Sequence, residues 1–152
     1  MNEHETVCMA VADEPLADPT IEKIRRMLAA RRDVACAYVF GSRATGKAGE
    51  GSDYDIGVVT TGSTPGERLA VQLDLAAALE RVAPCDLVDL EGAAPVLLNE
   101  VLRDGKAIVC NSHAKHHDFL VSVPRKLDEY FHLHRIQMRY LKERYSHGKG
   151  HC

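Results

Sequence analysis

The chain has 152 residues and a formal net charge of −3, which suits one domain with its own core and provides no overall basic field for binding nucleic acid directly. Five cysteines without a C-x-x-C pair exclude a disulfide framework and a zinc ribbon. No apolar run approaches the roughly 20 residues that cross a bilayer, so we expect a soluble, cytoplasmic protein with no membrane partner.

The first part of the chain predicts a leader, a helix and a buried strand. Residues 1–17 show no clear periodicity, and we expect a flexible leader there. Asp18-Pro19 is typical of an N-cap followed by the first helical residue, and apolar residues three and four apart extend this helix to about Arg32. Val34 to Phe40 is apolar and partly β-branched, which predicts a buried strand.

The middle of the chain continues the alternation of strands and helices. Arg43 to Ser52 predicts a short helical turn and a loop, Asp53 to Thr60 a second strand, and Leu69 to Leu79 a helix that closes near Ala83-Pro84. The next elements are a strand from Asp86 to Leu90, a helix from Pro95 to Arg103 and a strand from Ala107 to Cys110. This order predicts an α/β (α+β) fold with a small mixed sheet flanked by helices.

The C-terminal part of the chain predicts a helical segment over residues 113–146, with a frayed tail over 147–152. Pro124 interrupts the pattern, which predicts a kink or the start of a new helix. The segment either packs on its own domain, which is the simpler expectation, or docks a partner. One face carries most of its apolar and aromatic side chains, namely Leu127, Tyr130, Phe131, His134, Met138 and Leu141.

A pair of carboxylates indicates the chemistry. Asp53 and Asp55 are two residues apart on a predicted strand, so they project from the same face about 7 Å apart. Two carboxylates on one face repel each other and are costly to desolvate unless a cation lies between them. Mg²⁺ prefers such oxygen ligands, and Tyr54 between them should point to the other face, into the core.

Gly41-Ser42 at the end of the preceding strand complements the carboxylate pair. Gly41 lets the backbone approach a phosphate closely, and the Ser42 hydroxyl and the amides of the following turn can donate to phosphate oxygens. Together the two features predict a triphosphate cradle opposite a metal site, in which catalysis consists of positioning and charge neutralisation.

A third acidic residue is expected on a neighbouring strand. Asp86 and Asp89 lie on the third predicted strand and face opposite ways. We favour Asp86, because it begins the strand and stands among apolar residues; it would complete the coordination of one metal and help to deprotonate the incoming hydroxyl. Asp89 is then an exposed residue at the end of the strand.

A zinc site is a separate possibility further along the chain. His113, His116 and His117 follow Cys110 at helical ligand spacing. Histidines in an exposed polar stretch are more simply explained as solvated.

The stretch from Gly41 to Gly57, GSRATGKAGEGSDYDIG, resembles the signature of the DNA polymerase β-like nucleotidyltransferase superfamily, and within it the minimal nucleotidyltransferase (MNT) group. The segment from Cys85 to Lys106 is similar to the third-carboxylate strand and following helix of the MNT antitoxins. The resemblance implies a polymerase β-like nucleotidyltransferase domain over residues 18–112. Thr45 departs from the pattern, because a basic residue is common there; Arg43 and Lys47 lie close by.

The resemblance also implies a function. MNT antitoxins transfer AMP from ATP to a tyrosine of a HEPN-domain toxin, an RNA-cleaving partner, and thereby silence it. Carried over, Gly41, Ser42 and Arg43 would bind the nucleotide, and Asp53, Asp55 and Asp86 would be the catalytic, metal-binding acids for two Mg²⁺ ions. The protein would form a hetero-oligomer with its toxin. Two alternatives remain open: nucleotide transfer to a small molecule such as an aminoglycoside, and neutralisation of the partner by binding alone.

Overall fold

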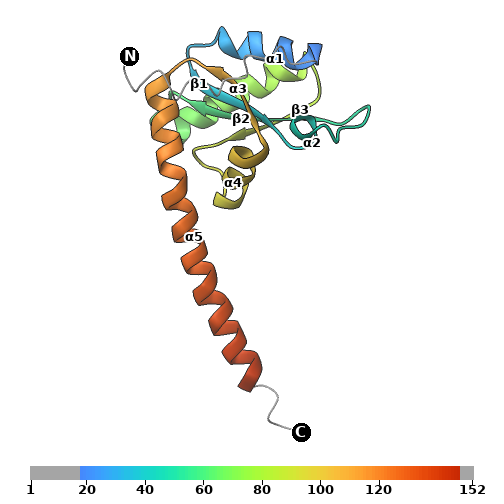
Figure 1. Cartoon of the computed structure of the whole chain (residues 1–152). Helices are drawn as coiled ribbons and strands as arrows, with labels where there is room; N and C mark the ends of the chain where they lie inside the picture. The colour runs from blue at the N-terminus through green and yellow to red at the C-terminus, as the bar shows by residue number, and fades with distance from the viewer. Residues whose placement is uncertain (1–17, 148–152) are drawn as a thin grey trace, which may run out of the picture.

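The computed structural model describes residues 18–147 (Figure 1), and the expected leader 1–17 and tail residues 148–152 lie outside the described residues. Helices and strands alternate along the described part as the sequence predicts. In chain order they are α1 (Pro19–Ala29), β1 (Val34–Phe40), α2 (Ser42–Thr45), β2 (Tyr54–Thr60), α3 (Pro65–Glu80), β3 (Cys85–Asp89), α4 (Pro95–Asp104), β4 (Lys106–Cys110) and α5 (His113–His147).

The strands form one four-stranded sheet in the order β3-β2-β1-β4. β1 is antiparallel to β2 and β4, whereas β2 and β3 are parallel, so the expected small mixed sheet is confirmed. Every residue of β1 is buried, which explains its uninterrupted apolar sequence, because a central strand covered on both faces has no polar side.

Helices cover both faces of the sheet. α1 and α3 pack on one face, where Ile24, Leu28 and Leu75 join Ile56 and Val58 in one cluster of buried side chains. α4 and the first half of α5 pack on the other face, as Figure 1 shows. The buried side chains on that face are Ala35, Cys36, Tyr38, Phe40, Val59, Leu90, Leu98, Val101, Ala107, Phe119 and Val123.

α3 begins four residues earlier than the apolar pattern predicts. The Thr64 hydroxyl accepts a hydrogen bond from the amide of Glu67 at 3.2 Å, and the Glu67 carboxylate accepts one from the Thr64 amide at 3.2 Å. This capping box, with Pro65 at the first helical position, starts the helix before its apolar residues begin. The helix is therefore about one turn longer at its start than the sequence predicts.

α5 is one helix, and the expected start of a new helix at Pro124 is wrong. Proline removes one backbone hydrogen bond from the helix, a loss that flanking turns can tolerate. His116, Phe119 and Val123 are buried against the sheet, but all of residues 131–146 are exposed. The expectation that the whole segment packs on its own domain therefore fails for the second half of the helix. No helix within residues 18–147 is both long and apolar enough to span a membrane.

Candidate functional site

Three of the predicted site residues lie in a row across adjacent strands. Asp55 on β2 is the register partner of Phe40 on β1 and of Asp86 on β3. Gly41 directly follows Phe40, so Gly41, Asp55 and Asp86 meet at one edge of the sheet. Asp53 lies two residues before Asp55, just ahead of β2. The sheet thus gathers all three predicted acids beside the Gly41-Ser42 turn.

Gly41 has a conformation and surroundings that only glycine tolerates. Its φ is 67°, in the left-handed region that L side chains rarely adopt. A Cβ at this position would lie 2.1 Å from Asp55 Oδ2, well inside the contact distance of two atoms. The absent side chain therefore makes room for the Asp55 carboxylate; the close approach of a phosphate to Gly41 stays a prediction.

The acidic residues near Gly41 lie close enough together that their negative charges affect one another. The pKa of Asp55 is raised, first by burial and then by the negative charges of Asp86, Glu100 and Asp53. The pKa of the Cys85 thiol is raised to about 11 by burial and by the charges of Asp53 and Asp86. Such a cluster of carboxylates favours the binding of a cation, because a cation would cancel the repulsion.

Glu100 is a member of this acidic group that the sequence analysis missed. It is exposed on α4, 45 residues along the chain from Asp55, and it acts on Asp55 through its charge. Its neighbours Leu98 and Val101 are buried under the sheet, which brings α4 close to the site. No local motif identifies Glu100, because its position depends on how α4 packs.

Arg43 anchors the loop that leads to Asp53. Its guanidinium donates to the Ser52 carbonyl oxygen at 2.7 and 3.2 Å and lies 4.3 Å from the centre of the Tyr54 ring. It is also 3.8 Å from Asp18 Oδ2. The predicted contact between Arg43 and a nucleotide stays a prediction; the contacts seen here hold Ser52, and with it the start of β2.

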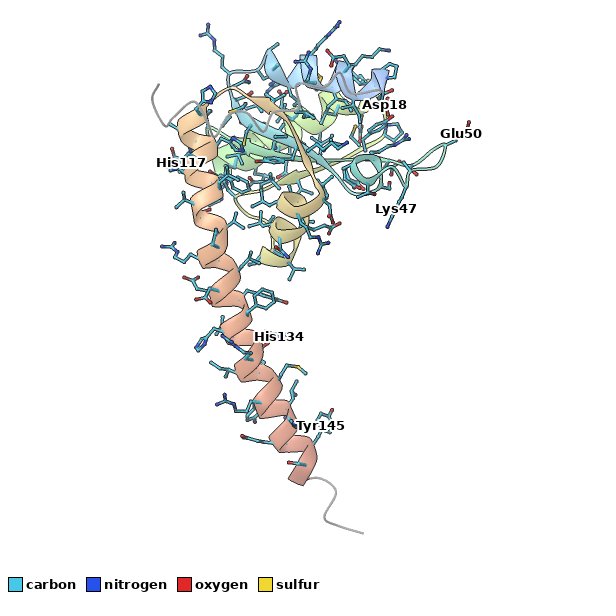
Figure 2. The ribbon with its side chains drawn as sticks, in the orientation of Figure 1. Asp18, Lys47, Glu50, His117, His134 and Tyr145 are labelled. Atoms are coloured by element: carbon cyan, nitrogen blue, oxygen red, sulfur yellow. The ribbon has the colours of Figure 1, made fainter. Side chains whose placement is uncertain are left out.

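Tyr54 and Asp18 tie α1 to β2 on the far side of the site. The Tyr54 hydroxyl donates to Asp18 Oδ2 at 2.7 Å, and Asp18 Oδ1 caps α1 by accepting from the Thr20 amide at 2.8 Å. Tyr54 is buried, as expected, with its ring on the α1 side of the sheet. Figure 2 shows Asp18 at the start of α1, with Lys47 and Glu50 on the loop that extends beyond α2.

Asp86 and Asp89 have different surroundings. Asp86 is exposed and is the register partner of Asp55. Asp89, in contrast, accepts from Arg68 Nε at 3.0 Å and from the Glu91 amide at 3.2 Å. Contrary to the expectation of an exposed residue, Asp89 is therefore held in an ion pair, because α3 places Arg68 over the end of β3.

Within residues 18–147, no group of three or more His, Cys, Asp or Glu side chains is arranged to hold a metal ion. The histidines near Cys110 have other contacts. Cys110 Sγ lies 3.6 Å from His113 Nδ1 and 3.7 Å from His116 Nδ1. Contrary to the expectation of solvated histidines, His116 is buried and hydrogen-bonded to the Tyr38 hydroxyl, because it lies on the inner face of α5; His117 is exposed.

More than half of the chain matches a known protein family. Residues 22–114 match the family described as polymerase beta, nucleotidyltransferase. No curated protein matches the chain.

Several solved structures similar to this chain are toxin–antitoxin complexes. One is a toxin–antitoxin with AMP-PNP, with a TM-score of 0.54 and 26% identity over 82% of this chain and 94% of that one. Two mutants of the toxin–antitoxin MntA-HpeT have TM-scores of 0.53 and 0.51 and identities of 25% and 27%. Each covers 81% of this chain, and 94% and 93% of the respective other chain. The protein therefore belongs to the polymerase beta nucleotidyltransferase family, with a fold that resembles the MNT antitoxins of toxin–antitoxin pairs.

Proposed function

We propose that this protein is an antitoxin that transfers AMP from ATP to a tyrosine of a cognate HEPN-domain toxin and thereby neutralises it. The observation that carries the proposal is the row of Gly41, Asp55 and Asp86 at one edge of the sheet, with Asp53 beside it. This arrangement combines a glycine turn with three acids, which is what phosphoryl transfer with bound divalent metal requires.

The acidic residues fit Mg²⁺ in their chemistry. All three offer carboxylate oxygens, the ligands that Mg²⁺ prefers. The pKa of Asp55 is raised by burial and by neighbouring carboxylates, so a bound cation would stabilise its ionised form. The acids are not yet arranged as a ligand group, but Asp53 and Asp86 are exposed, so their side chains are free to turn toward Asp55 at little cost. Bound Mg²⁺ would neutralise the triphosphate and the developing charge.

Different residues of the chain bind the phosphate, position the site and accept the proton of the tyrosine. Ser42, the first residue of α2, donates a hydrogen bond from its hydroxyl to a phosphate oxygen, and Asp55, fixed against Gly41, sets the position of the site. Asp86 accepts the proton of the tyrosine hydroxyl while the tyrosine oxygen forms a bond to the α-phosphorus of ATP. The bond from that phosphorus to the bridging oxygen breaks, and pyrophosphate leaves with the electron pair.

A protein acceptor is supported by the likeness to antitoxin chains, which extends over more than four fifths of this chain. One of these complexes was solved with AMP-PNP. AMP joined to a tyrosine adds negative charge and bulk, which suits the silencing of a site that binds RNA.

Intact mass spectrometry tests the proposal. The purified protein is incubated with the product of the neighbouring gene, Mg²⁺ and ATP, and the mass of that partner is measured. The expected result is a gain of one or more AMP units that is absent with the Asp53→Asn/Asp55→Asn double variant. A partner of unchanged mass in a tight complex would contradict AMP transfer.

Neutralisation by binding alone is the second candidate. It is favoured by the exposed apolar side chains in the second half of α5, because a surface of this kind binds a partner without any transfer. Under this alternative the Asp53→Asn/Asp55→Asn variant protects cells from the toxin as well as the unaltered protein does, whereas transfer predicts that protection is lost.

A further inference from the structure

The second half of α5 is an isolated helix with an apolar surface. Residues 131–146, named the distal helix here, extend away from the sheet (Figure 1), and every one of them is exposed. Exposed apolar surface of this extent on a soluble domain marks an interaction site. The large apolar side chains of the distal helix that are exposed are Phe131, Leu133, Ile136, Met138, Tyr140, Leu141 and Tyr145.

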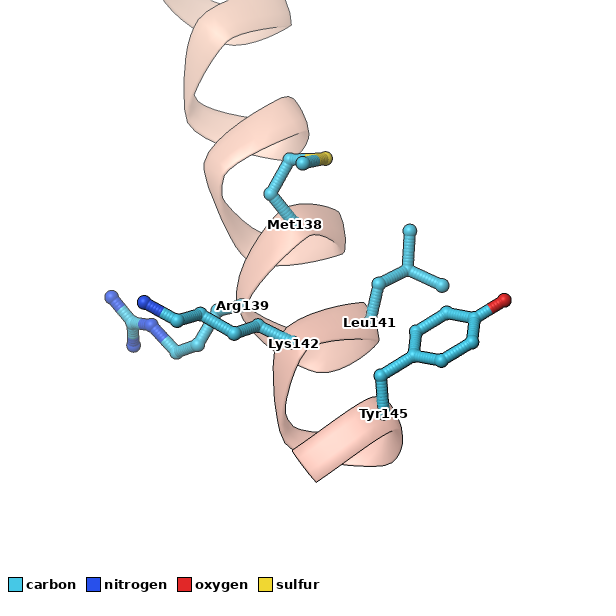
Figure 3. A pocket seen from close by; sticks show the side chains of 5 residues that line it. All are labelled: Met138, Arg139, Leu141, Lys142 and Tyr145. Carbon is cyan, nitrogen blue, oxygen red and sulfur yellow. The ribbon is translucent and has the colours of Figure 1, made fainter. Parts of the chain in front are cut away.

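These side chains form two stripes on different sides of the helix. Phe131, Met138, Leu141 and Tyr145 are separated by seven, three and four residues and follow one side. Met138, Leu141 and Tyr145 line a hollow of about 540 Å³ together with Arg139 and Lys142. Figure 3 shows the three apolar side chains of this hollow pointing to one side of the helix and the two basic ones to the other.

The second stripe consists of Leu133, Ile136 and Tyr140, at spacings of three and four residues. Leu133 follows Phe131 by two residues, so at about 100° per residue the second stripe begins roughly 200° around the helix from the first. An in-plane membrane helix needs a single apolar face, which this helix lacks. Two opposed stripes suit a helix that is contacted from both sides, as in a groove between the helices of another protein.

The charge of the distal helix indicates what kind of protein covers it. It carries four basic residues, Arg135, Arg139, Lys142 and Arg144, and one acidic residue, Glu143, although the whole chain has a net charge of −3. Pairing two copies of this helix would bring like charges together, which opposes self-association. A partner surface that complements the charge of the distal helix is therefore acidic.

We propose that the distal helix is the docking element for the toxin and binds in an acidic, apolar groove between toxin helices. The inference rests on the proposed function and adds the surface and the chemistry of the contact. Figure 1 shows the distal helix well apart from α2 and β3, which border the row formed by Gly41, Asp55 and Asp86. Docking and AMP transfer therefore use separate surfaces, and substitutions can separate them.

The Met138→Glu/Leu141→Glu variant tests the docking surface. Both side chains are exposed, at 52% and 42%, so the fold should survive. The matched control is Leu69→Glu/Leu73→Glu, which adds the same charge at exposed positions of α3. The affinity for the product of the neighbouring gene is measured by calorimetry with all three proteins, and their thermal unfolding is compared.

The expected result is that the α5 variant binds at least about 30-fold more weakly, as at a central interface position, whereas the α3 variant binds like the unaltered protein. The Arg135→Gln/Arg139→Gln variant is expected to bind more weakly and with less dependence on salt. Equal binding by the unaltered protein and the α5 variant would overturn the inference. If the partner binds equally and gains AMP from the unaltered protein and from the α5 variant, the proposed function stands and only the docking inference fails. If the unaltered protein neither binds nor modifies the partner, the docking inference and the proposed function both fail.

Two further measurements address the other occupants. Light scattering after size-exclusion chromatography should show a monomer in the absence of the partner; a dimer that Met138→Glu/Leu141→Glu dissolves would assign the surface to a second copy. Sedimentation with vesicles of phosphatidylserine and phosphatidylcholine should leave the protein in the supernatant. Binding to vesicles that the same variant abolishes would assign the surface to a membrane. Either result would overturn the docking of the toxin here.

Discussion

Gly41 and Asp55 lie so close together that a Cβ at position 41 would be 2.1 Å from Asp55 Oδ2. The Asp55 carboxylate on β2 thus occupies the space beside the end of β1 that a side chain at position 41 would need. Since β1 and β2 are register partners up to this point, the contact fixes the Asp55 carboxylate against the backbone of the Gly41 turn.

Gly41→Ala should therefore disturb the site more than its backbone strain alone would. The matched control is Gly46→Ala, because Gly46 has a similar φ of 76° but nothing within 4 Å of an added Cβ. We expect Gly41→Ala to lower the free energy of unfolding by at least about 1 kcal/mol more than Gly46→Ala. Denaturant unfolding measures the difference; equal losses would contradict a fixed contact between Gly41 and Asp55.

Asp55→Asn should stabilise the protein in the absence of Mg²⁺ while it removes activity. The pKa of Asp55 is raised in the folded state, so ionisation of this group opposes folding once the pH rises above its unfolded value. The gain in stability should appear at neutral pH and vanish at acidic pH, where both states are protonated. Thermal unfolding against pH gives the result, and a destabilised variant at neutral pH would contradict it.

The stabilising effect of Asp55→Asn should reverse with Mg²⁺. A cation that binds the folded protein stabilises it by mass action, and Asp55→Asn weakens the site. We expect Mg²⁺ with ATP to raise the unfolding temperature of the unaltered protein more than that of the variant. Equal shifts would mean that Asp55 does not bind the metal.

Asp18→Ala should destabilise α1 in a manner that depends on pH. Burial alone would raise the pKa of Asp18, but hydrogen bonds from Tyr54 and from the amides of Thr20 and Ile21, with the charge of Arg43, lower it overall. A lowered pKa contributes stability above the unfolded value, and this stability is lost as pH falls through the folded value. We expect a cost of about 1–2 kcal/mol at neutral pH from the lost N-cap.

The cost of Asp18→Ala should shrink when the protein is acidified below the folded pKa of Asp18. Denaturant unfolding at neutral and acidic pH measures it. Asp18→Asn is the control, since it keeps a capping oxygen but not the charge. A cost that stays constant with pH would contradict an ionised Asp18 as acceptor for Tyr54.

Arg43→Gln separates the two roles open to this residue. If Arg43 anchors the loop through the Ser52 carbonyl, the variant exchanges its amide hydrogens faster around Ser52 and Asp53 without any nucleotide. If Arg43 serves the nucleotide alone, exchange in the nucleotide-free protein is unchanged. Hydrogen–deuterium exchange measured by mass spectrometry gives the result, and the contacts seen in the structure predict faster exchange.

Local patterns predicted the strands well. The bounds of β1 follow from an apolar run between Asp33 and Gly41, and the pair Asp53 and Asp55 follows from a motif with fixed spacing. Both signals lie within a few residues, so no knowledge of packing is needed to detect them.

Tertiary packing decided what the sequence could not show. Glu100 affects Asp55 only because α4 packs on the same face of the sheet. The burial of His116 depends on Tyr38, which lies 78 residues earlier in the chain. The periodicity of α5 predicted an apolar face, but a pattern of this kind is the same whether the face is covered by the domain or by another protein.

Two variants on the same strand test whether the acidic residues beside Gly41 carry out the transfer of AMP. Asp86 is the register partner of Asp55, whereas Asp89 is held by Arg68. Transfer of AMP from α-labelled ATP to the product of the neighbouring gene is measured with Asp86→Asn and with Asp89→Asn. We expect transfer to be lost with Asp86→Asn and kept with Asp89→Asn; transfer that survives Asp86→Asn would show that these carboxylates do not carry out the reaction.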